Sequence, residues 1–177
     1  DSIKVSYDVL DFNNEFWNYA ESLNENTDQY KNLVFWGADD FYFNKIHHEI
    51  NFIFQHLLER ITPATKYIGF SLFATNIRPS IEAMRMIRKK FPKIKLFCGG
   101  PQCNDPLLDK AAADQILDAV VIGEGEESCI DLIKHWQTDE NYSGTIPGVN
   151  MNRQGRLVAG PSRNLMDVNN LPLPNFT

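Results

Sequence analysis

The residues best placed for chemistry in this 177-residue chain are the glycines and carboxylates of Asp118–Glu127, DAVVIGEGEE. Gly123 and Gly125 permit positive φ angles and let a ligand approach the backbone closely. Glu124 and Glu126 place carboxylates at the start of a helix, where the positive end of the helix dipole favours them. The β-branched apolar run before the first glycine is typical of a buried parallel strand. This stretch predicts a small-molecule site at a strand-to-helix turn.

Two further turns share this pattern of small residues after an apolar run. Ser71 opens the loop that reaches Asn76, and Gly99-Gly100-Pro101 follows an apolar segment. In open α/β sheets, ligands bind just outside the carboxyl ends of the strands. We therefore expect Ser71, Gly100 and Gly125 to surround one elongated cleft. The alternatives remain open that the glycines serve only tight turns and that the glutamates only cap a helix.

Three strand–loop–helix units must position these turns. The expected strands are Tyr67–Leu72, Ile94–Cys98 and Ala119–Ile122, and the expected helices run from Pro79 to Phe91, around Leu107–Ala113 and through Trp136. The strand at Tyr67 is apolar on both faces, which favours a central position between two helical layers. Successive units of this length predict an α/β fold with three layers, in which a doubly wound, mostly parallel sheet resembles Rossmann-like or flavodoxin-like proteins.

The flanking segments complete one expected domain over residues 1–160. We expect a half-buried strand at Ile3–Leu10 and amphipathic helices at Phe12–Leu23 and Ile46–Ile61. A C-terminal β-hairpin is predicted in which Val149 and Met151 face Leu157 and Ala159 across a loop at Asn152–Gly155. Residues 161–177 contain Leu171-Pro172-Leu173-Pro174, which is typical of a linker.

Composition and charge argue against several classes of function. A net charge of -6, with one basic run at Arg85–Lys95, gives no footprint for nucleic acid. No apolar run is long enough to span a bilayer. Cys98, Cys103 and Cys129 form neither a Cys-x-x-Cys motif nor a zinc-like set, and no signal peptide precedes them, so we expect reduced thiols in the cytoplasm. The histidines His47, His48 and His56 are expected to be solvated or packing residues, because their spacing does not suit one metal ion.

Five segments carry a resemblance to a known family. They are YIGFSLFATN, FCGGPQCN, VVIGEGEES, IPGVNMNRQGRLV and LMDVNNLPLPNF. Together, in this order and spacing, they resemble the N-terminal cobalamin-binding domain of the B12-dependent radical S-adenosylmethionine enzymes. The resemblance covers Tyr67–Pro101 and Asp118–Thr177, and more weakly Ile3–Tyr19.

The resemblance implies that cobalamin lies across the carboxyl ends of the parallel strands, the same edge that the turns indicate. The cofactor-binding residues carried over by position are Gly69, Ser71, Leu72, Thr75, Gly99, Gly100, Pro101, Gly123, Glu124, Gly125 and Glu126. Backbone amides and small hydroxyls suit the phosphodiester and flat base of the cobalamin tail. No catalytic residue and no metal ligand is implied in this chain.

The sequence differs from related cobalamin proteins in two respects. The Asp-x-His-x-x-Gly motif, which supplies an axial histidine to cobalt in cobalamin mutases, is absent. From the resemblance, we expect the family's first strand and first helix, which would precede the DFN segment, to be missing from this chain. The resemblance implies a radical domain after Thr177, with a [4Fe-4S] cluster and S-adenosylmethionine, that carries out methyl transfer or tetrapyrrole ring chemistry. Two alternatives are a flavodoxin-like domain that binds a nucleotide or flavin, and a degenerate cobalamin-type domain with a purely structural role.

Overall fold

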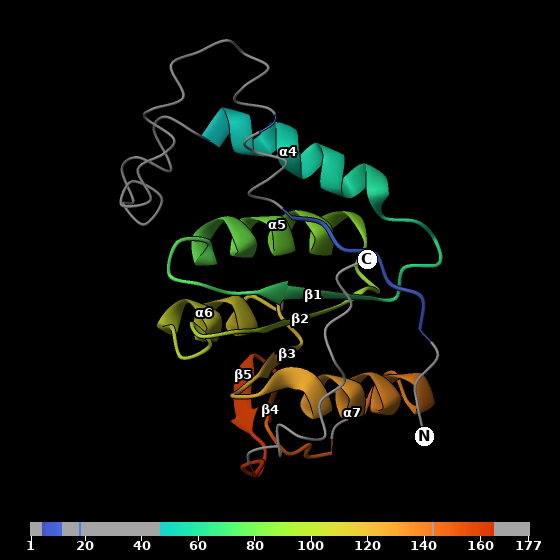
Figure 1. The fold of residues 1–177 in the computed structure, drawn as a ribbon, viewed down its shortest axis with the longest axis vertical. Helices are drawn as coiled ribbons and strands as arrows, with labels where there is room; N and C mark the ends of the chain where they lie inside the picture. The colour runs from blue at the N-terminus through green and yellow to red at the C-terminus, as the bar shows by residue number, and fades with distance from the viewer. Residues whose placement is uncertain (1–4, 12–17, 19–46, 143, 165–177) are drawn as a thin grey trace.

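The computed structural model describes residues 5–11, 18, 47–142 and 144–164 (Figure 1). Its helices and strands are α4 His47–Arg60, β1 Tyr67–Ser71, α5 Ile77–Lys90, β2 Lys95–Gly99, α6 Pro106–Ala113, β3 Ala119–Val121, α7 Gly125–Thr138, β4 Val149–Arg153 and β5 Arg156–Ala159. The result is an α/β fold with a five-stranded sheet, compatible with a Rossmann-like fold.

The three strands predicted to carry the site are neighbours in one sheet. β1 pairs with β2 and β2 with β3, both in parallel, which confirms the predicted arrangement. Helices α5 and α6 connect them, as parallel strands require a crossover. The prediction of a central position for the Tyr67 strand is wrong for the described residues, because β1 lies at the edge of their sheet. Only Phe70 of its five residues is buried, so apolar residues on both faces of a strand do not by themselves require strands on both sides.

Side chains alternate between the two faces of the sheet and enter two hydrophobic clusters. On one face, Leu96 and Cys98 join a cluster with α4, α5 and α6. On the other face, Phe97 packs with Trp136 of α7. Figure 1 shows α4 lying along α5 on the far side of the latter from the sheet. The predicted helix Ile46–Ile61 corresponds to α4, with Phe54, Leu57 and Leu58 buried.

The last two strands form an antiparallel pair beside β3. A two-residue turn at Gln154 and Gly155 joins β4 to β5, and both residues have positive φ, as a type I′ turn requires. Met151 pairs with Val158 and Asn152 with Leu157, so the pairing is displaced by one residue from the predicted one. The displacement arises because Asn152 belongs to β4 and not to the loop. Its Nδ2 donates to the carbonyls of Ala112 and Leu117 at 2.9 and 2.7 Å.

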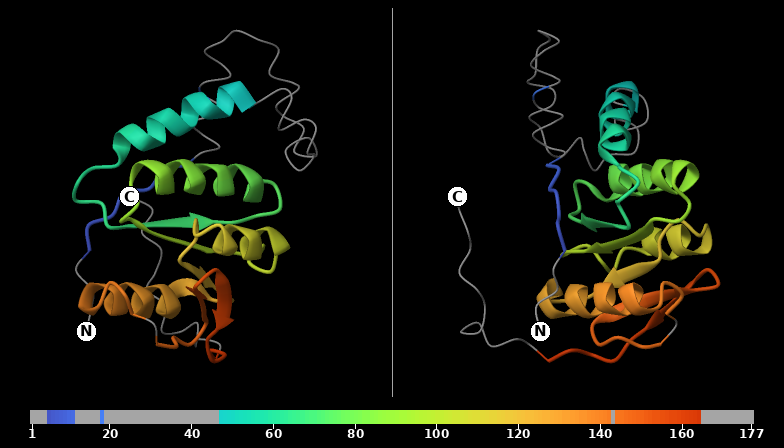
Figure 2. Two further views of the ribbon diagram at one scale, coloured as in Figure 1. Left: turned by 180° about the vertical axis from the view of Figure 1, so that it is seen from behind. Right: turned by 90° about the vertical axis from the view of Figure 1, so that its right-hand side faces the viewer.

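The N-terminal segment differs from its prediction. Residues 5–11 form no strand, and Val5, Tyr7 and Val9 are exposed. Figure 2 shows this segment crossing the direction of β1 and not lying alongside it. Alternation of apolar residues alone does not make a strand, because the backbone also needs a hydrogen-bonding partner. Apart from Asn18, which is helical, the predicted helix at Phe12–Leu23 lies outside the described residues, as do the linker prolines at 172 and 174.

Candidate functional site

The three predicted turns meet at the carboxyl edge of the parallel strands. Ser71 is in register with Gly99, which brings the β1 and β2 ends together. A Cβ built on Gly99 would lie 3.6 Å from Cβ of Val121 at the end of β3, and one on Gly125 would lie 3.7 Å from Cγ1 of the same residue. The sequence-predicted juxtaposition of the turns is therefore present in the structure. We refer to this region as the carboxyl edge.

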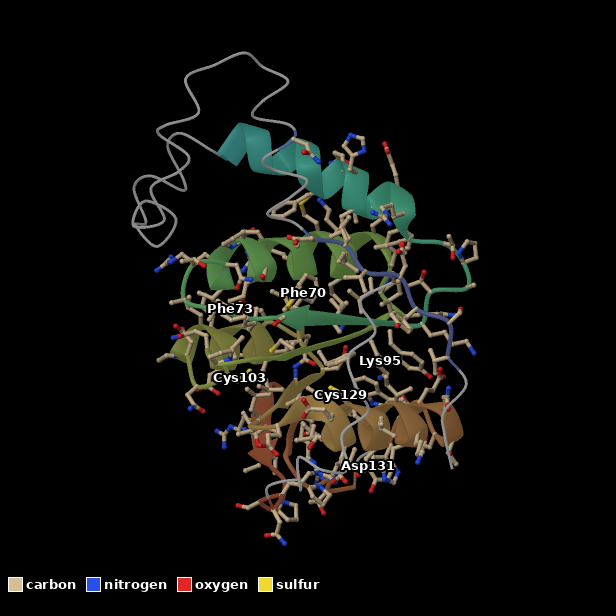
Figure 3. The ribbon with its side chains drawn as sticks, in the orientation of Figure 1. Phe70, Phe73, Lys95, Cys103, Cys129 and Asp131 are labelled. Atoms are coloured by element: carbon tan, nitrogen blue, oxygen red, sulfur yellow. The ribbon has the colours of Figure 1, made fainter. Side chains whose placement is uncertain are left out.

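Asn76 closes the turn between β1 and α5. Its Oδ1 accepts a hydrogen bond from the Phe73 amide at 2.8 Å, and its Nδ2 donates to the Ser71 carbonyl at 2.9 Å. The turn leaves Ser71 exposed and Thr75 half-buried, so both hydroxyls lie near solvent. Phe73, which the sequence analysis did not select, is 50% exposed at this edge (Figure 3). Phe73 could have been selected from the sequence, because it is an aromatic residue just beyond the end of a predicted strand.

Backbone hydrogen bonds and close packing hold the Gly100 turn against the residue that follows β1. Leu72 is fully buried, its amide donates to the Gly99 carbonyl at 2.7 Å, and its carbonyl accepts from the Gln102 amide at 3.3 Å. Gly100 has a φ of 108°, and a Cβ there would lie 2.7 Å from the Leu72 carbonyl oxygen. Backbone contact within the protein therefore accounts for this glycine. Pro101 is exposed beside it.

The Gly123 turn, by contrast, is open. Gly123 has a φ of 76°, and nothing lies within 4 Å of the position that its Cβ would occupy. Glu124 takes the N-cap position of α7 in an extended conformation, and Gly125 is the first residue of the helix. Glu126 is exposed in the first turn. Of the two glycines in this motif, only Gly123 uses a positive φ.

Arg163, beyond β5, anchors the start of α7 from the side of the hairpin. Its Nη1 donates to Oε2 of Glu127 at 2.7 Å, its Nη2 pairs with Asp131, and its Nε donates to the Pro147 carbonyl at 3.3 Å. The Ser128 hydroxyl donates to the same carbonyl at 3.2 Å. These contacts fix the helix start that borders the carboxyl edge. The sequence carried no local signal for them, because the partners lie more than fifteen residues apart.

Gly69 lies apart from the edge. It occupies the middle of β1, and a Cβ there would lie 2.6 Å from Cζ of Phe97. The glycine makes room for this aromatic ring on the face that packs against α7. The structure thus places Gly69 away from the turns that the other predicted residues share.

All three cysteines are free thiols, and two of them are neighbours behind the Gly100 turn. A hydrogen bond with the Cys103 side chain, together with burial, raises the pKa of the Cys98 thiol. The same hydrogen bond lowers the pKa of Cys103. Cys129 packs in the cluster on the other face of the sheet, where burial and the charge of Glu126 raise its pKa.

The described residues contain no group of three or more histidine, cysteine or acidic side chains that could hold a metal ion. The side chain of His56 is 57% exposed on α4, as expected for a solvated residue. Within the same residues, no helix has the length and apolar character needed to cross a membrane. Among the described residues, the carboxyl edge offers backbone groups, hydroxyls, carboxylates and the exposed ring of Phe73.

No protein-family model matches the chain. Two curated proteins are similar to it. One is the cobalamin-dependent radical SAM methyltransferase TokK of Streptomyces tokunonensis, 23% identical over 94 residues, which is 53% of this chain and 14% of the relative. The other is 2-(S-pantetheinyl)-carbapenam-3-carboxylate methyltransferase of Streptantibioticus cattleyicolor, 26% identical over 93 residues, which is 52% of this chain and 14% of the relative. The matched region is thus a small part of either methyltransferase.

Proposed function

We propose that this chain is the cobalamin-binding module of a radical S-adenosylmethionine methyltransferase, in which a separate domain of the same parent protein performs catalysis. The observation that carries the proposal is the meeting of three small-residue turns at the ends of adjacent parallel strands. Ligands of open α/β sheets bind at such ends. The similarity to TokK, whose name includes cobalamin dependence, favours cobalamin over other ligands of this edge.

The residues at the edge suit a broad, flat cofactor. Gly123 is exposed and leaves open space where a side chain would stand, and Phe73 offers apolar surface. We assign contact with cobalamin to Ser71, Thr75, Gly99, Pro101, Gly123, Glu124, Gly125 and Glu126. The hydroxyls and backbone amides would serve the phosphodiester of the tail, and the carboxylates would accept hydrogen bonds from the amides around the corrin ring. When bound, cobalamin supplies a carrier for a methyl group.

We assign a supporting role to three other residues of the predicted set. Leu72 is buried and both of its backbone groups are engaged, Gly100 is packed against it, and Gly69 receives the Phe97 ring. These residues would hold the edge in shape without contacting the cofactor. The [4Fe-4S] cluster and S-adenosylmethionine belong, in this proposal, to the catalytic domain of the parent.

Titration of the chain with hydroxocobalamin, followed by gel filtration and visible absorbance, tests the proposal. We expect corrin absorbance to travel with the protein, whereas flavin mononucleotide should not. Gly123→Asn should weaken corrin binding by roughly ten-fold or more, because it places a side chain in the open space of the turn. Asparagine tolerates positive φ, so the backbone should be little strained.

Gly155→Asn is the matched control. Gly155 also has a positive φ, of 88°, but it lies in the hairpin turn away from the carboxyl edge. Its variant should bind hydroxocobalamin as the parent does. If the parent retains no corrin, or if both variants bind it equally well, the edge is not a cobalamin site. The close backbone contact between Gly100 and Leu72 would then favour the alternative that this domain has a purely structural role and supports a neighbouring domain.

A further inference from the structure

Two of the three cysteines flank the Gly100 turn, and their side chains meet behind it. Cys98 belongs to β2 and is fully buried, whereas Cys103 follows the turn and is half-buried. Both side chains pack in the hydrophobic cluster that α5 and α6 share with the sheet, and their thiols are joined by a hydrogen bond. Figure 3 shows Cys103 at the same end of the sheet as Phe73. We refer to Cys98 and Cys103 as the thiol pair.

Cys129, the third cysteine of the chain, lies on the other face of the sheet. It packs in the cluster that includes Trp136 of α7 and not in the cluster of the thiol pair. The sheet therefore separates Cys129 from Cys98. The chain thus has one pair of neighbouring thiols and one thiol apart from them, which provides an internal comparison.

The two thiols of the pair differ in access and in acidity. Cys98 is fully buried, so a dissolved oxidant does not reach its sulfur directly. The hydrogen bond between the thiols lowers the pKa of Cys103, whereas the same bond, together with burial, raises the pKa of Cys98. Because the thiolate is the reactive form, Cys103 is the thiol that reacts first with an oxidant. Cys98 is then the neighbouring thiol that can react with oxidised Cys103.

The backbone permits the small movement that an S–S bond of about 2 Å requires. Cys98 is held in β2, which pairs with a strand on each side. Beyond the glycines, the amides of Gln102, Cys103 and Asp105 donate to backbone carbonyls at 3.3 Å, longer than the usual value of about 2.9 Å. Cys103 therefore lies in the loosely bonded part of the turn, and its sulfur can approach that of Cys98 while the strand stays in place.

We propose that the thiol pair is a redox-modification site, at which a hydroperoxide converts Cys98 and Cys103 into a disulfide that closes a ring around the Gly100 turn. A dithiol reverses the reaction by thiol–disulfide exchange and is itself oxidised to a disulfide. The inference does not depend on cobalamin binding, since it concerns the thiols alone and is tested without the corrin.

The reaction has two steps. The Cys103 thiolate attacks the terminal peroxide oxygen and breaks the O–O bond, which leaves a sulfenic acid on Cys103 and releases an alkoxide that takes up a proton. The sulfur of Cys98 then attacks the sulfenic sulfur, and the displaced hydroxide leaves as water with the proton of the Cys98 thiol. Two thiols and one hydroperoxide thus give one disulfide, one alcohol and one water, with two electrons passing from the sulfur atoms to the peroxide.

Hydrogen peroxide, added to the reduced 177-residue chain, is the probe. Trypsin places Cys98 and Cys103 together in peptide 96–110 and Cys129 in peptide 111–134. After unfolding and alkylation with N-ethylmaleimide, peptide 96–110 should be unalkylated and lighter by two hydrogen atoms, and dithiothreitol should restore both alkylation sites. The pair should be oxidised roughly ten-fold or more faster than Cys129, whose thiol has a raised pKa.

Three variants assign the roles of the thiols. Cys98→Ser keeps a hydroxyl but cannot form the disulfide, so sulfenic acid should persist at Cys103 and be trapped by dimedone in several-fold higher yield than in the parent. Cys103→Ser should leave the buried Cys98 open to alkylation after unfolding. Cys129→Ser is the matched control and should form the disulfide at the parent rate. Circular dichroism confirms that each variant is folded before oxidation.

Three results would overturn the proposal. The first is a peptide 96–110 that remains alkylated at both cysteines at peroxide concentrations up to those that oxidise Cys129. The second is a disulfide that joins Cys129 to either member of the pair, or joins two chains, in place of the expected one. The third is a dimedone adduct of Cys103 that is as abundant in the parent as in Cys98→Ser, because Cys98 would then not react with the sulfenic acid.

Discussion

Two glycines with positive φ stand at the carboxyl edge, and they differ in what surrounds them. Gly100, at 108°, is enclosed by the backbone of Leu72, whereas Gly123, at 76°, has nothing within 4 Å of its missing side chain. Both follow parallel strands of the same sheet and both were predicted as ligand contacts from the same reasoning. The comparison teaches that the fold itself requires a glycine at position 100, whereas the surroundings of Gly123 leave room for the ligand contact that we propose.

A substitution at Gly100 tests this comparison most directly. Gly100→Ala should lower the free energy of unfolding by about 2–5 kcal/mol, because it adds backbone strain at positive φ and an overlap with the Leu72 carbonyl. Urea unfolding followed by circular dichroism measures the change. Gly99→Ala in the adjacent position is the control, since its Cβ would make ordinary contact at 3.6 Å. Equal stability of the two variants would contradict the enclosed role of Gly100.

Asn76 tests whether the β1 turn is held by its side chain. Asn76→Ala removes the hydrogen bonds to the Phe73 amide and the Ser71 carbonyl, and should cost about 1–2 kcal/mol of unfolding free energy. Corrin binding should fall with it, because Ser71 and Phe73 lose their fixed positions. Asn76→Asp restores the acceptor for Phe73 but not the donor, so its stability should lie between the parent and the alanine variant. A stability of Asn76→Ala equal to that of the parent would show that the backbone alone fixes this turn.

At Gly123 the effect on folding should be smaller than at Gly100. Gly123→Ala should cost about 1 kcal/mol, because strain at positive φ is the sole penalty where no atom is within 4 Å. Paired urea curves for Gly100→Ala and Gly123→Ala give the contrast in one experiment. If Gly123→Ala proves the more destabilising of the two, contacts in this turn are tighter than the structure indicates.

Much of this fold is predictable because it depends on local patterns. Continuous apolar runs located β1, β2 and β3, and the position of proline and glycine residues located the turns between strands and helices. The meeting of the three turns followed from the rule that parallel strands end at one edge.

The remainder depends on contacts between distant residues. The enclosure of Gly100 requires the backbone of Leu72, twenty-eight positions earlier, and the role of Gly69 requires the ring of Phe97. The hairpin register depends on Asn152, whose amide bonds to carbonyls near α6. Phe73 was missed because its apolar side chain continues the strand pattern, although the chain has already left the strand. The contacts of Gly100, Gly69 and Asn152 could not be predicted from the spacing of residues in the sequence.

The smallest expected effect concerns the thiols that follow the two glycine turns. Cys103 follows Gly100 and has a lowered pKa, whereas Cys129 follows Gly123 on α7 and has a raised pKa. Because the thiolate is the reactive form, Cys103 should react with iodoacetamide faster and from a lower pH than Cys129. Cys98 is fully buried and should not react in the folded chain. Peptide mass spectrometry across a pH series gives the order of labelling, with unfolding curves of the labelled protein recorded alongside.

Substitution at Cys98 shows whether the neighbouring thiol is the cause of this order. Cys98→Ala removes the hydrogen bond that lowers the pKa of Cys103, so the labelling of Cys103 should shift to higher pH while that of Cys129 stays unchanged. Cys98→Ser keeps a hydroxyl donor in the same place and should preserve most of the shift. Labelling of Cys129 before Cys103 in the parent would mean that the closed turn behind Gly100 shields its thiol more than the thiol pair activates it. The enclosure of that turn would then govern its chemistry as well as its stability.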